Sequence, residues 1–333
     1  MNETMAVAVV AVHDDEAGLR LDRWFHRRYP TLSHGRLEKL LRTGQVRVDG
    51  KRAQAGDRLA GGEQIRVPPL PAENRGPRPG TEAGGLDPRA AAALVASVVY
   101  RDGDIIAINK EPGLAVQGGS GTHRHVDGLL DALRFGAAER PRLVHRLDKD
   151  TSGLLVLGRS AGAAARLAAA FRERTTLKEY WAVVVGVPKV AQGTIDLPLA
   201  KATGGAYGRE QMTVDDEAGD RAVTDYETVD VAGKKAALLI LRPLTGRTHQ
   251  LRVHCAALGT PILGDGKYGG DRAFIDAPGI ARRLHLHAAR LALPRGVDGK
   301  GILRLAAPPP PHFAATVAAL GFEMPRDVQV RSR

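Results

Sequence analysis

Cysteine is nearly absent from this sequence, in which Cys255 is the only example. A single cysteine excludes an intrachain disulfide and any zinc site built from several cysteines. Its neighbours in LRVHCAALG (251–259) are mostly apolar and have helical spacing. We therefore expect Cys255 to be a small, buried hydrophobic side chain.

Long hydrophobic runs are also missing. The apolar stretch MAVAVVAV (5–12) has eight residues, which is too short to cross a bilayer. Acidic residues flank it and no basic leader precedes it, so it lacks the pattern of a signal peptide. We expect a first β-strand here, a cytoplasmic location and no membrane partner.

The patterns of phosphate-binding loops and metal sites are absent or incomplete. GDGKYGG (264–270) is rich in glycine but matches neither G-x-x-x-x-G-K-[ST] nor G-x-G-x-x-G after a strand. HLH (285–287) and the pair His249 and His254 each offer two ligands, whereas zinc needs three or four at a recognised spacing. We expect no metal.

The charge balance is strongly basic. Lys and Arg number 48 against 37 Asp and Glu, for a net charge of +11. Such an excess favours a polyanionic partner, because Lys and Arg release counterions when they neutralise phosphates. The simpler alternative is an ordinary basic protein.

Residues 18–67 have the pattern of a small α/β module. Apolar residues recur at helical spacing in LRLDRWFHRRY (19–29) and in SHGRLEKLLRTG (33–44). A hairpin is predicted in QVRVDGKRA (45–53), where Asp-Gly marks the turn.

The charged faces of these two helices carry many Arg and Lys side chains, among them Arg36, Lys39 and Arg42. Like charges at this density weaken a helix unless something anionic lies beside it, although an ordinary solvated face is the alternative. Two short basic helices followed by β-structure resemble the S4 RNA-binding module. That resemblance implies that Arg36, Lys39 and Arg42 bind RNA.

A stretch rich in Pro and Gly follows this S4-like module. Residues 68–93 show no apolar periodicity over most of their length, and we predict a linker there. The remaining residues, 94–325, form one predicted domain.

Short apolar strands recur in this second domain, and helices are predicted only near 160–173, 248–258 and 312–320. Because several strands follow one another without a crossover helix, we predict an α+β fold with a mostly antiparallel sheet. The predicted strands are SVVY (97–100), DIIAIN (104–109), GLLVLG (153–158), EYWAVVVG (179–186), AALLILRP (236–243), HLHAARLAL (285–293) and GILRLAA (301–307).

One segment, LVHRLDKDTSGLLVLGRS (143–160), places charged residues directly before an apolar strand. Asp148 could simply cap a turn or pair with Arg146 or Lys149. However, loops at sheet ends often carry function, and a second basic segment, TGRTHQLRVH (245–254), follows about a hundred residues later. A carboxylate kept ionised by an arginine can act as a nucleophile or base without a metal.

These segments resemble the RluA-type pseudouridine synthases, and most closely the RluC branch, which modifies 23S ribosomal RNA. The resemblance covers most of the chain. It is carried by HRLDKDTSGLLVL (145–157), KEYWAVVVG (178–186), LTGRTHQLRVHCAALGTPILGD (244–265), RLHLHAARL (283–291) and NKEPGLAVQGGSGT (109–122).

The resemblance implies a role for five residues. Asp148 is the expected catalytic carboxylate, and Arg252 the arginine that keeps it charged. Tyr180 is expected to stack on the target uracil, and Arg146 to fill the space that the extruded base leaves. Leu286 is expected to form a wall of the pocket.

Elementary chemistry agrees with this assignment. Pseudouridine formation breaks the N1 glycosidic bond and reattaches the uracil through C5, so nothing is consumed and we expect no cofactor. The target base must leave its stack, which requires a side chain that stacks on the base. On a helix over 248–258, Arg252 lies about 100° from the apolar Leu251 and is free to reach the loop at 145–153.

Several alternatives stay open at this stage. The sequence does not tell whether Asp148 attacks the ribose, attacks the base or removes a ribose proton. A sister synthase acting on other ribosomal or transfer RNA sites, and a non-catalytic rRNA-binding assembly factor, are the rival functions. We expect the enzyme to work as a monomer on large-subunit ribosomal RNA.

Overall fold

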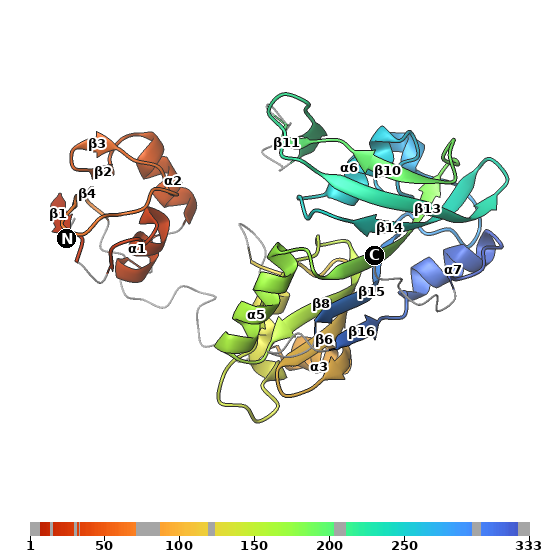
Figure 1. Cartoon of the computed structure of the whole chain (residues 1–333), viewed down its shortest axis with the longest axis horizontal. Helices are drawn as coiled ribbons and strands as arrows, with labels where there is room; N and C mark the ends of the chain where they lie inside the picture. The colour runs from red at the N-terminus through yellow and green to blue at the C-terminus, as the bar shows by residue number, and fades with distance from the viewer. Residues whose placement is uncertain are drawn as a thin grey trace. The chain divides into compact units, whose positions relative to one another are not determined.

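The computed structural model divides into two compact units, residues 1–84 and 85–333 (Figure 1). Each unit has its own sheet and core. The structure describes residues 7–13, 16–29, 32, 34–70, 87–118, 124–202, 211–294 and 301–325.

The N-terminal unit contains a four-stranded antiparallel sheet in the order β1-β4-β2-β3. The predicted hairpin is confirmed: Asp49 and Gly50 both have positive φ, 46° and 75°, as a two-residue type I′ turn requires. Its elements are β1 (Ala8–Ala11), α1 (Leu21–Arg28), α2 (His34–Arg42), β2 (Arg47–Val48), β3 (Lys51–Arg52) and β4 (Gln64–Val67).

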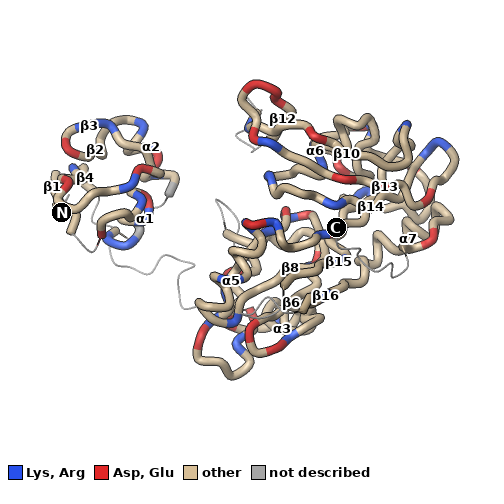
Figure 2. Tube along the Cα trace, in the orientation of Figure 1, with Lys and Arg blue, Asp and Glu red and all other residues tan. Residues whose placement is uncertain are grey.

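Both predicted helices of this unit bury their apolar faces. Leu21, Trp24 and Phe25 of α1 are at most 1% exposed, and Leu37 and Leu41 of α2 join them in one core. The opposite faces carry Lys and Arg (Figure 2). Two helices with β-structure are therefore confirmed, whereas the relationship to the S4 module stays a prediction.

The larger unit is built on a ten-stranded sheet. Its main path runs β10-β13-β14-β9-β15-β8-β6-β5, with β16 beside β15 and β7 beside β8. Among the paired strands of the described residues, only β8 and β15 run parallel, so the predicted α+β fold with a mostly antiparallel sheet is confirmed. The strands are β5 (Val98–Arg101), β6 (Ile105–Lys110), β7 (Arg142–Leu143), β8 (Ser152–Gly158), β9 (Leu177–Val185), β10 (Gln192–Asp196), β13 (Val223–Ala232), β14 (Ala236–Pro243), β15 (Leu286–Pro294) and β16 (Ile302–Ala306), with a separate pair β11 (Leu199–Lys201) and β12 (Met212–Val214).

The helices of the larger unit lie around this sheet (Figure 1). Those predicted near 160–173, 248–258 and 312–320 are confirmed, with ends that differ by one or two residues. Cys255 is fully buried in the second of them, as expected. Among the described residues of this unit, the α-helices are α3 (Pro88–Ala96), α4 (Val126–Leu129), α5 (Ala161–Arg172), α6 (Gln250–Ala257) and α7 (Pro311–Ala319).

Helix α3 corrects the predicted linker at 68–93, of which residues 71–86 lie outside the described part of the chain. The Asp87 side chain accepts a hydrogen bond from the Arg89 backbone N–H, and Pro88 occupies the first turn. Both are helix-start signals. Ala90 and Leu94 are buried in the core of the larger unit, so this end of the predicted linker is part of that unit.

Within the described residues, every helix is too short or too polar to cross a membrane.

Strands β8 and β15 come very close together at Gly153. This residue has φ +109°, and a Cβ added to it would lie 2.2 Å from the Ala288 carbonyl oxygen. Ser152 and Gly153 pair with His287 and Ala288 of β15. Gly153 therefore lets β8 start beside β15, directly after the loop that contains Asp148.

A buried lysine also holds the loop that contains Asp148. Lys110 is 1% exposed, and its Nζ donates to the carbonyl oxygens of Glu111 (2.9 Å), Leu114 (2.9 Å) and Lys149 (3.0 Å). Burial lowers the pKa of Lys110 to about 8, against the attraction of Asp150 and Asp148. The ammonium thus joins the end of β6 to the residue after Asp148.

The variant Gly153→Ala tests the close approach. We expect it to lower the free energy of unfolding by about 1–3 kcal/mol more than Gly136→Ala does, because only the first adds a steric clash. Gly136 has a similar positive φ of +81° with nothing within 4 Å of its would-be Cβ, so it isolates the backbone strain. Urea unfolding measures both, and equal losses would contradict the proposed clash.

The variant Lys110→Met tests the buried ammonium. Because the pKa of Lys110 is about 8 in the folded protein and 10.5 for an unperturbed lysine, the unfolded chain holds more protons between these values. The free energy of unfolding of the wild type, measured relative to Lys110→Met, should therefore rise with pH in this window, by up to about 1.4 kcal/mol per pH unit. Urea titrations at several pH values check this, and a difference that does not change with pH would rule it out.

Candidate active site

The loop at 144–151 contains both exposed and inward-packed side chains. Leu147 is buried, and the His145 ring stacks on Phe171 with centroids 4.3 Å apart. Burial lowers the pKa of His145 to about 3, so its Nε2 is free to accept a hydrogen bond from the Val156 N–H at 2.8 Å. Between and after these two residues, Arg146 is exposed and the Asp148 side chain is 25% exposed, so both are accessible.

Arg146 and Asp148 line a cavity of about 630 Å³. The other walls come from Tyr180 on β9, from the segment that leads into α6 with Arg252, and from Leu286 at the start of β15. The structure thus brings together all five residues that the resemblance singled out in this unit. Their roles stay predictions.

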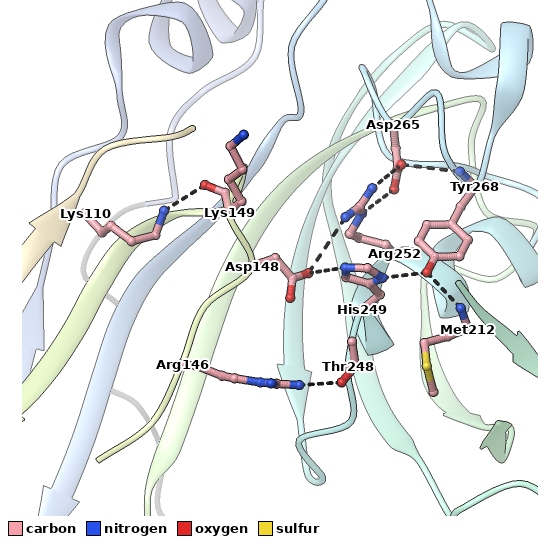
Figure 3. A network of polar contacts seen from close by, with 10 residues as sticks. All are labelled: Lys110, Arg146, Asp148, Lys149, Met212, Thr248, His249, Arg252, Asp265 and Tyr268. Atoms are coloured by element: carbon pink, nitrogen blue, oxygen red, sulfur yellow. Dashed lines mark hydrogen bonds and ion pairs between the residues drawn. The ribbon is translucent and has the colours of Figure 1, made fainter. Parts of the chain in front are cut away.

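Asp148 stands between two basic groups without a hydrogen bond to either (Figure 3). Its side chain is 25% exposed, and its Oδ2 lies 3.9 Å from Arg252 Nη1 and 3.9 Å from His249 Nε2. These separations allow electrostatic attraction but exceed hydrogen-bond distance. The carboxylate is therefore held in place electrostatically and still accessible from the cavity.

The first partner of Arg252 is Asp265. Arg252 Nε donates to Asp265 Oδ2 at 2.8 Å and Nη2 donates to Oδ1 at 2.7 Å, with both side chains buried. From the sequence we expected Arg252 to keep Asp148 charged. In the structure the guanidinium is fixed by Asp265, and only Nη1 approaches Asp148. Burial opposes the charged form of Arg252, but the hydrogen bonds that it donates to Asp265, together with the negative charges of Asp265 and Asp148, outweigh burial and raise its pKa.

Tyr180 and Leu286 form an apolar part of the wall. Tyr180 packs against both main hydrophobic clusters of the larger unit, and Leu286 is 3% exposed. Burial, together with the negative charge of Asp148, raises the pKa of the Tyr180 hydroxyl, which therefore stays protonated at neutral pH. The ring is a rigid surface on which a planar base can stack.

Arg146 reaches across the cavity. It is exposed, and its Nη2 donates to Thr248 Oγ1 at 2.6 Å, so it joins the loop before β8 to the segment before α6 (Figure 3). A single hydrogen bond to an exposed guanidinium is weak enough to be exchanged for a contact with a ligand.

Sequence analysis missed several residues of the site. Asp265 and Tyr268 lie in GDGKYGG, which we discounted as a phosphate loop, and His249 was weighed only as a metal ligand. In the structure His254 points elsewhere, with hydrogen bonds to Thr224 Oγ1 (2.9 Å) and the Leu197 carbonyl (3.1 Å). The signal that could have identified them is that a histidine, an arginine, an aspartate and a tyrosine lie within a stretch of twenty residues, 249–268.

A second cavity, of about 500 Å³, adjoins the first and shares Asp148, His249 and Arg252 with it. Lys149 also lines it, and in Figure 3 the side chains of Lys149 and Arg146 extend away from Asp148 in different directions. Further basic residues of this second cavity are Lys267, Arg282 and Arg283.

The three predicted RNA-binding residues of α2 belong to the N-terminal unit. Arg36, Lys39 and Arg42 are all exposed there, on the face opposite the buried leucines. Their role is addressed below as a proposal.

Comparisons with known proteins identify RNA pseudouridine synthases as relatives of this chain. The family model described as RNA pseudouridylate synthase matches residues 104–257. Ribosomal large subunit pseudouridine synthase C of Rickettsia bellii is 36% identical over 88% of this chain and 95% of that protein. RNA pseudouridine synthase 4, mitochondrial, of Arabidopsis thaliana is 40% identical over 74% of this chain, which spans 59% of the length of that relative.

Solved structures show the same fold. Human RNA Pseudouridylate Synthase Domain Containing 4 is 32% identical, with a TM-score of 0.59 over 71% of this chain and 97% of that one. The similarity extends over nearly the whole Rickettsia relative as well as this human structure. The chain therefore belongs to the RNA pseudouridylate synthase family, as an RNA pseudouridine synthase of the RluA type.

Proposed function

We propose that this enzyme converts uridine to pseudouridine at specific positions of large-subunit ribosomal RNA, with Asp148 as the catalytic carboxylate. The observation that carries the proposal is the accessible Asp148 on a cavity of about 630 Å³ with an aromatic wall and several basic residues. The substrate class follows from relatives named ribosomal large subunit pseudouridine synthase C.

The apolar wall suits an extruded uracil. Taking a base out of its stack costs a few kcal/mol, and stacking on an aromatic side chain returns about 1–3 kcal/mol. Tyr180 offers such a face, and Leu286 closes the pocket beside it. The planar base is thus held next to Asp148 while its glycosidic bond is broken and it is turned from N1 to C5.

Arg146 is placed to stabilise the RNA that has lost its base. Its guanidinium rests on Thr248 at the edge of the cavity, and planar guanidinium groups stack well on bases. We propose that it leaves Thr248 and fills the gap in the RNA stack.

We propose that the N-terminal unit strengthens RNA binding and takes no part in the reaction itself. Arg36, Lys39 and Arg42 are exposed on one helix, and none of them has an ion-pair partner among the residues that the structure describes. Such side chains suit phosphates, as in the S4-like module inferred from the sequence. A cytoplasmic location and a monomeric state stay predictions.

The variant Asp148→Asn tests the catalytic role. Isomerisation releases the hydrogen at C5, so ribosomal RNA carrying 5-tritiated uridine should release tritium with the wild type. We expect the Asn variant to be slower by about a thousandfold or more, because the essential group has been removed. Asp216→Asn makes the same chemical change on an exposed loop and should behave as the wild type does.

Two outcomes would overturn the assignment. If the wild type releases no tritium from ribosomal RNA, the substrate is different or the protein is a non-catalytic binding factor, and transfer RNA is the next substrate to assay. If the Asn variant matches the wild type, Asp148 is not the catalytic group.

Reversing the charges of Arg36, Lys39 and Arg42 to Glu tests the N-terminal unit. Each lost phosphate contact removes about 0.7–0.9 from the slope of log K against log salt, so we expect weaker binding and a flatter salt dependence. Turnover at saturating RNA should change little.

A matched triple reversal separates this effect from net charge alone. It uses three exposed lysines of the larger unit that lie outside the cavities at Asp148, and it should reduce the salt dependence less. If the α2 variant loses turnover at saturating RNA, the N-terminal unit contributes to more than RNA affinity, which would contradict the proposal. The control positions are Lys189, Lys234 and Lys235.

A further inference from the structure

Both basic neighbours of Asp148 lie nearest to the same oxygen of its carboxylate. Arg252 Nη1 and His249 Nε2 each lie 3.9 Å from Oδ2. In Figure 3 the other oxygen of the carboxylate points away from this pair, toward the side on which Arg146 lies. The carboxylate is therefore asymmetric: one oxygen faces Arg252 and His249, and the other faces away from them.

His249 adopts an uncommon backbone conformation to reach this place. It is the residue just before α6 and has φ 54° and ψ 18°, in the left-handed region that is unfavourable for residues other than glycine. Buried Gln250 stabilises the turn: its Oε1 accepts from the Arg247 N–H at 3.0 Å, and its Nε2 donates to the Val223 carbonyl at 2.9 Å. Strain maintained in this way is typical of functional sites.

The Tyr268 hydroxyl is the hydrogen-bond partner of the other ring nitrogen of His249. The Tyr268 hydroxyl oxygen accepts from the Met212 backbone N–H at 3.2 Å and lies 2.6 Å from His249 Nδ1. Because that oxygen already accepts one hydrogen bond, its own proton is best placed to be donated to Nδ1. The imidazole proton is then on Nε2, which faces Asp148.

We propose that His249 is a positioning residue for the isomerisation: with its tautomer set by Tyr268, it joins Arg252 in holding Asp148 by Oδ2 and leaves Oδ1 as the oxygen that meets the uridine. The inference rests on the proposed function of Asp148. Neither His249 nor Tyr268 needs to touch the reacting atoms for this role.

The charges around His249 come from three segments. Asp148 approaches from the loop before β8, Arg252 from α6, and Asp265 and Lys267 from the loop after α6. Burial lowers the pKa of His249, and the attraction of Asp148 opposes this effect. The neutral imidazole therefore predominates near neutral pH, and acid converts it to an imidazolium that binds Oδ2 more strongly and adds a proton on Nδ1.

Single-turnover tritium release by the full chain tests the proposal. We expect His249→Ala to slow the step at saturating RNA by about 10- to 100-fold, as a misplaced catalytic group does, with RNA affinity changed by less than about twofold. His249→Gln restores an N–H near the position of Nε2 and should recover much of the rate. His254→Gln, one turn further along α6 and outside both cavities, is the matched control and should keep the wild-type rate.

Two further readouts distinguish positioning from simple loss of folding. His249→Gln has no imidazole to titrate. The part of the pH dependence of the rate that comes from protonation of His249, at pH values below the ordinary pKa of a histidine, should therefore be absent in this variant. Tyr268→Phe should slow the wild type but add little to His249→Gln, because both changes act through one hydrogen bond.

The proposal is overturned if His249→Ala keeps the wild-type rate, or if Ala and Gln are equally slow with an unchanged pH profile. It is also overturned if Tyr268→Phe and His249→Gln have fully additive effects. Failure of the underlying function looks different, since Asp148→Asn would then retain activity whatever the His249 variants do.

Discussion

The buried ion pair between Arg252 and Asp265 is the interaction on which the site depends. Its two short hydrogen bonds occupy Nε and Nη2 of the guanidinium and leave Nη1 for Asp148. An arginine with no such partner would be drawn to Asp148 and would form the close bidentate pair there instead. Asp265 thus keeps Arg252 near the Asp148 carboxylate without a close ion pair between the two.

Basic residues surround the acidic group in the larger cavity. Asp148 is the single carboxylate among the described residues that line the larger cavity, whose basic residues are Arg146, Arg172, Arg174, Lys178, Arg247 and Arg252. Phosphates therefore meet a surface of opposite sign even though the centre of the site is negative. The excess of Lys and Arg in the composition has a local counterpart at the place where RNA is proposed to bind.

The fold, and the residues that lie together at the candidate site, were largely predictable from sequence, for different reasons. The strands were visible as apolar runs, and Asp148, Tyr180 and Arg252 could be assigned because each lies in a segment that resembles a known family. Helix α3 was missed because Pro and Gly dominate the composition before it, although Asp87 and Pro88 signal a helix start. The predicted linker was therefore too long at its C-terminal end.

The supporting residues were harder to foresee, because periodicity says nothing about contacts between loops. Asp265 meets Arg252 only because the chain turns back after α6, and Lys110 reaches the Lys149 carbonyl from another strand. A glycine-rich loop such as GDGKYGG gives no pattern that separates a ligand-binding loop from one that positions a catalytic residue. Such roles follow only from coordinates.

The close approach at Gly153 has a geometric consequence for the site. Residues 152 and 153 pair with 287 and 288, so the loop of Asp148 and the pocket wall at Leu286 begin on two strands that touch backbone to backbone. Any side chain at position 153 would push the two strands apart, and with them Asp148 and Leu286. The distance between the acid and the apolar wall is therefore fixed by backbone contact and not by side-chain packing.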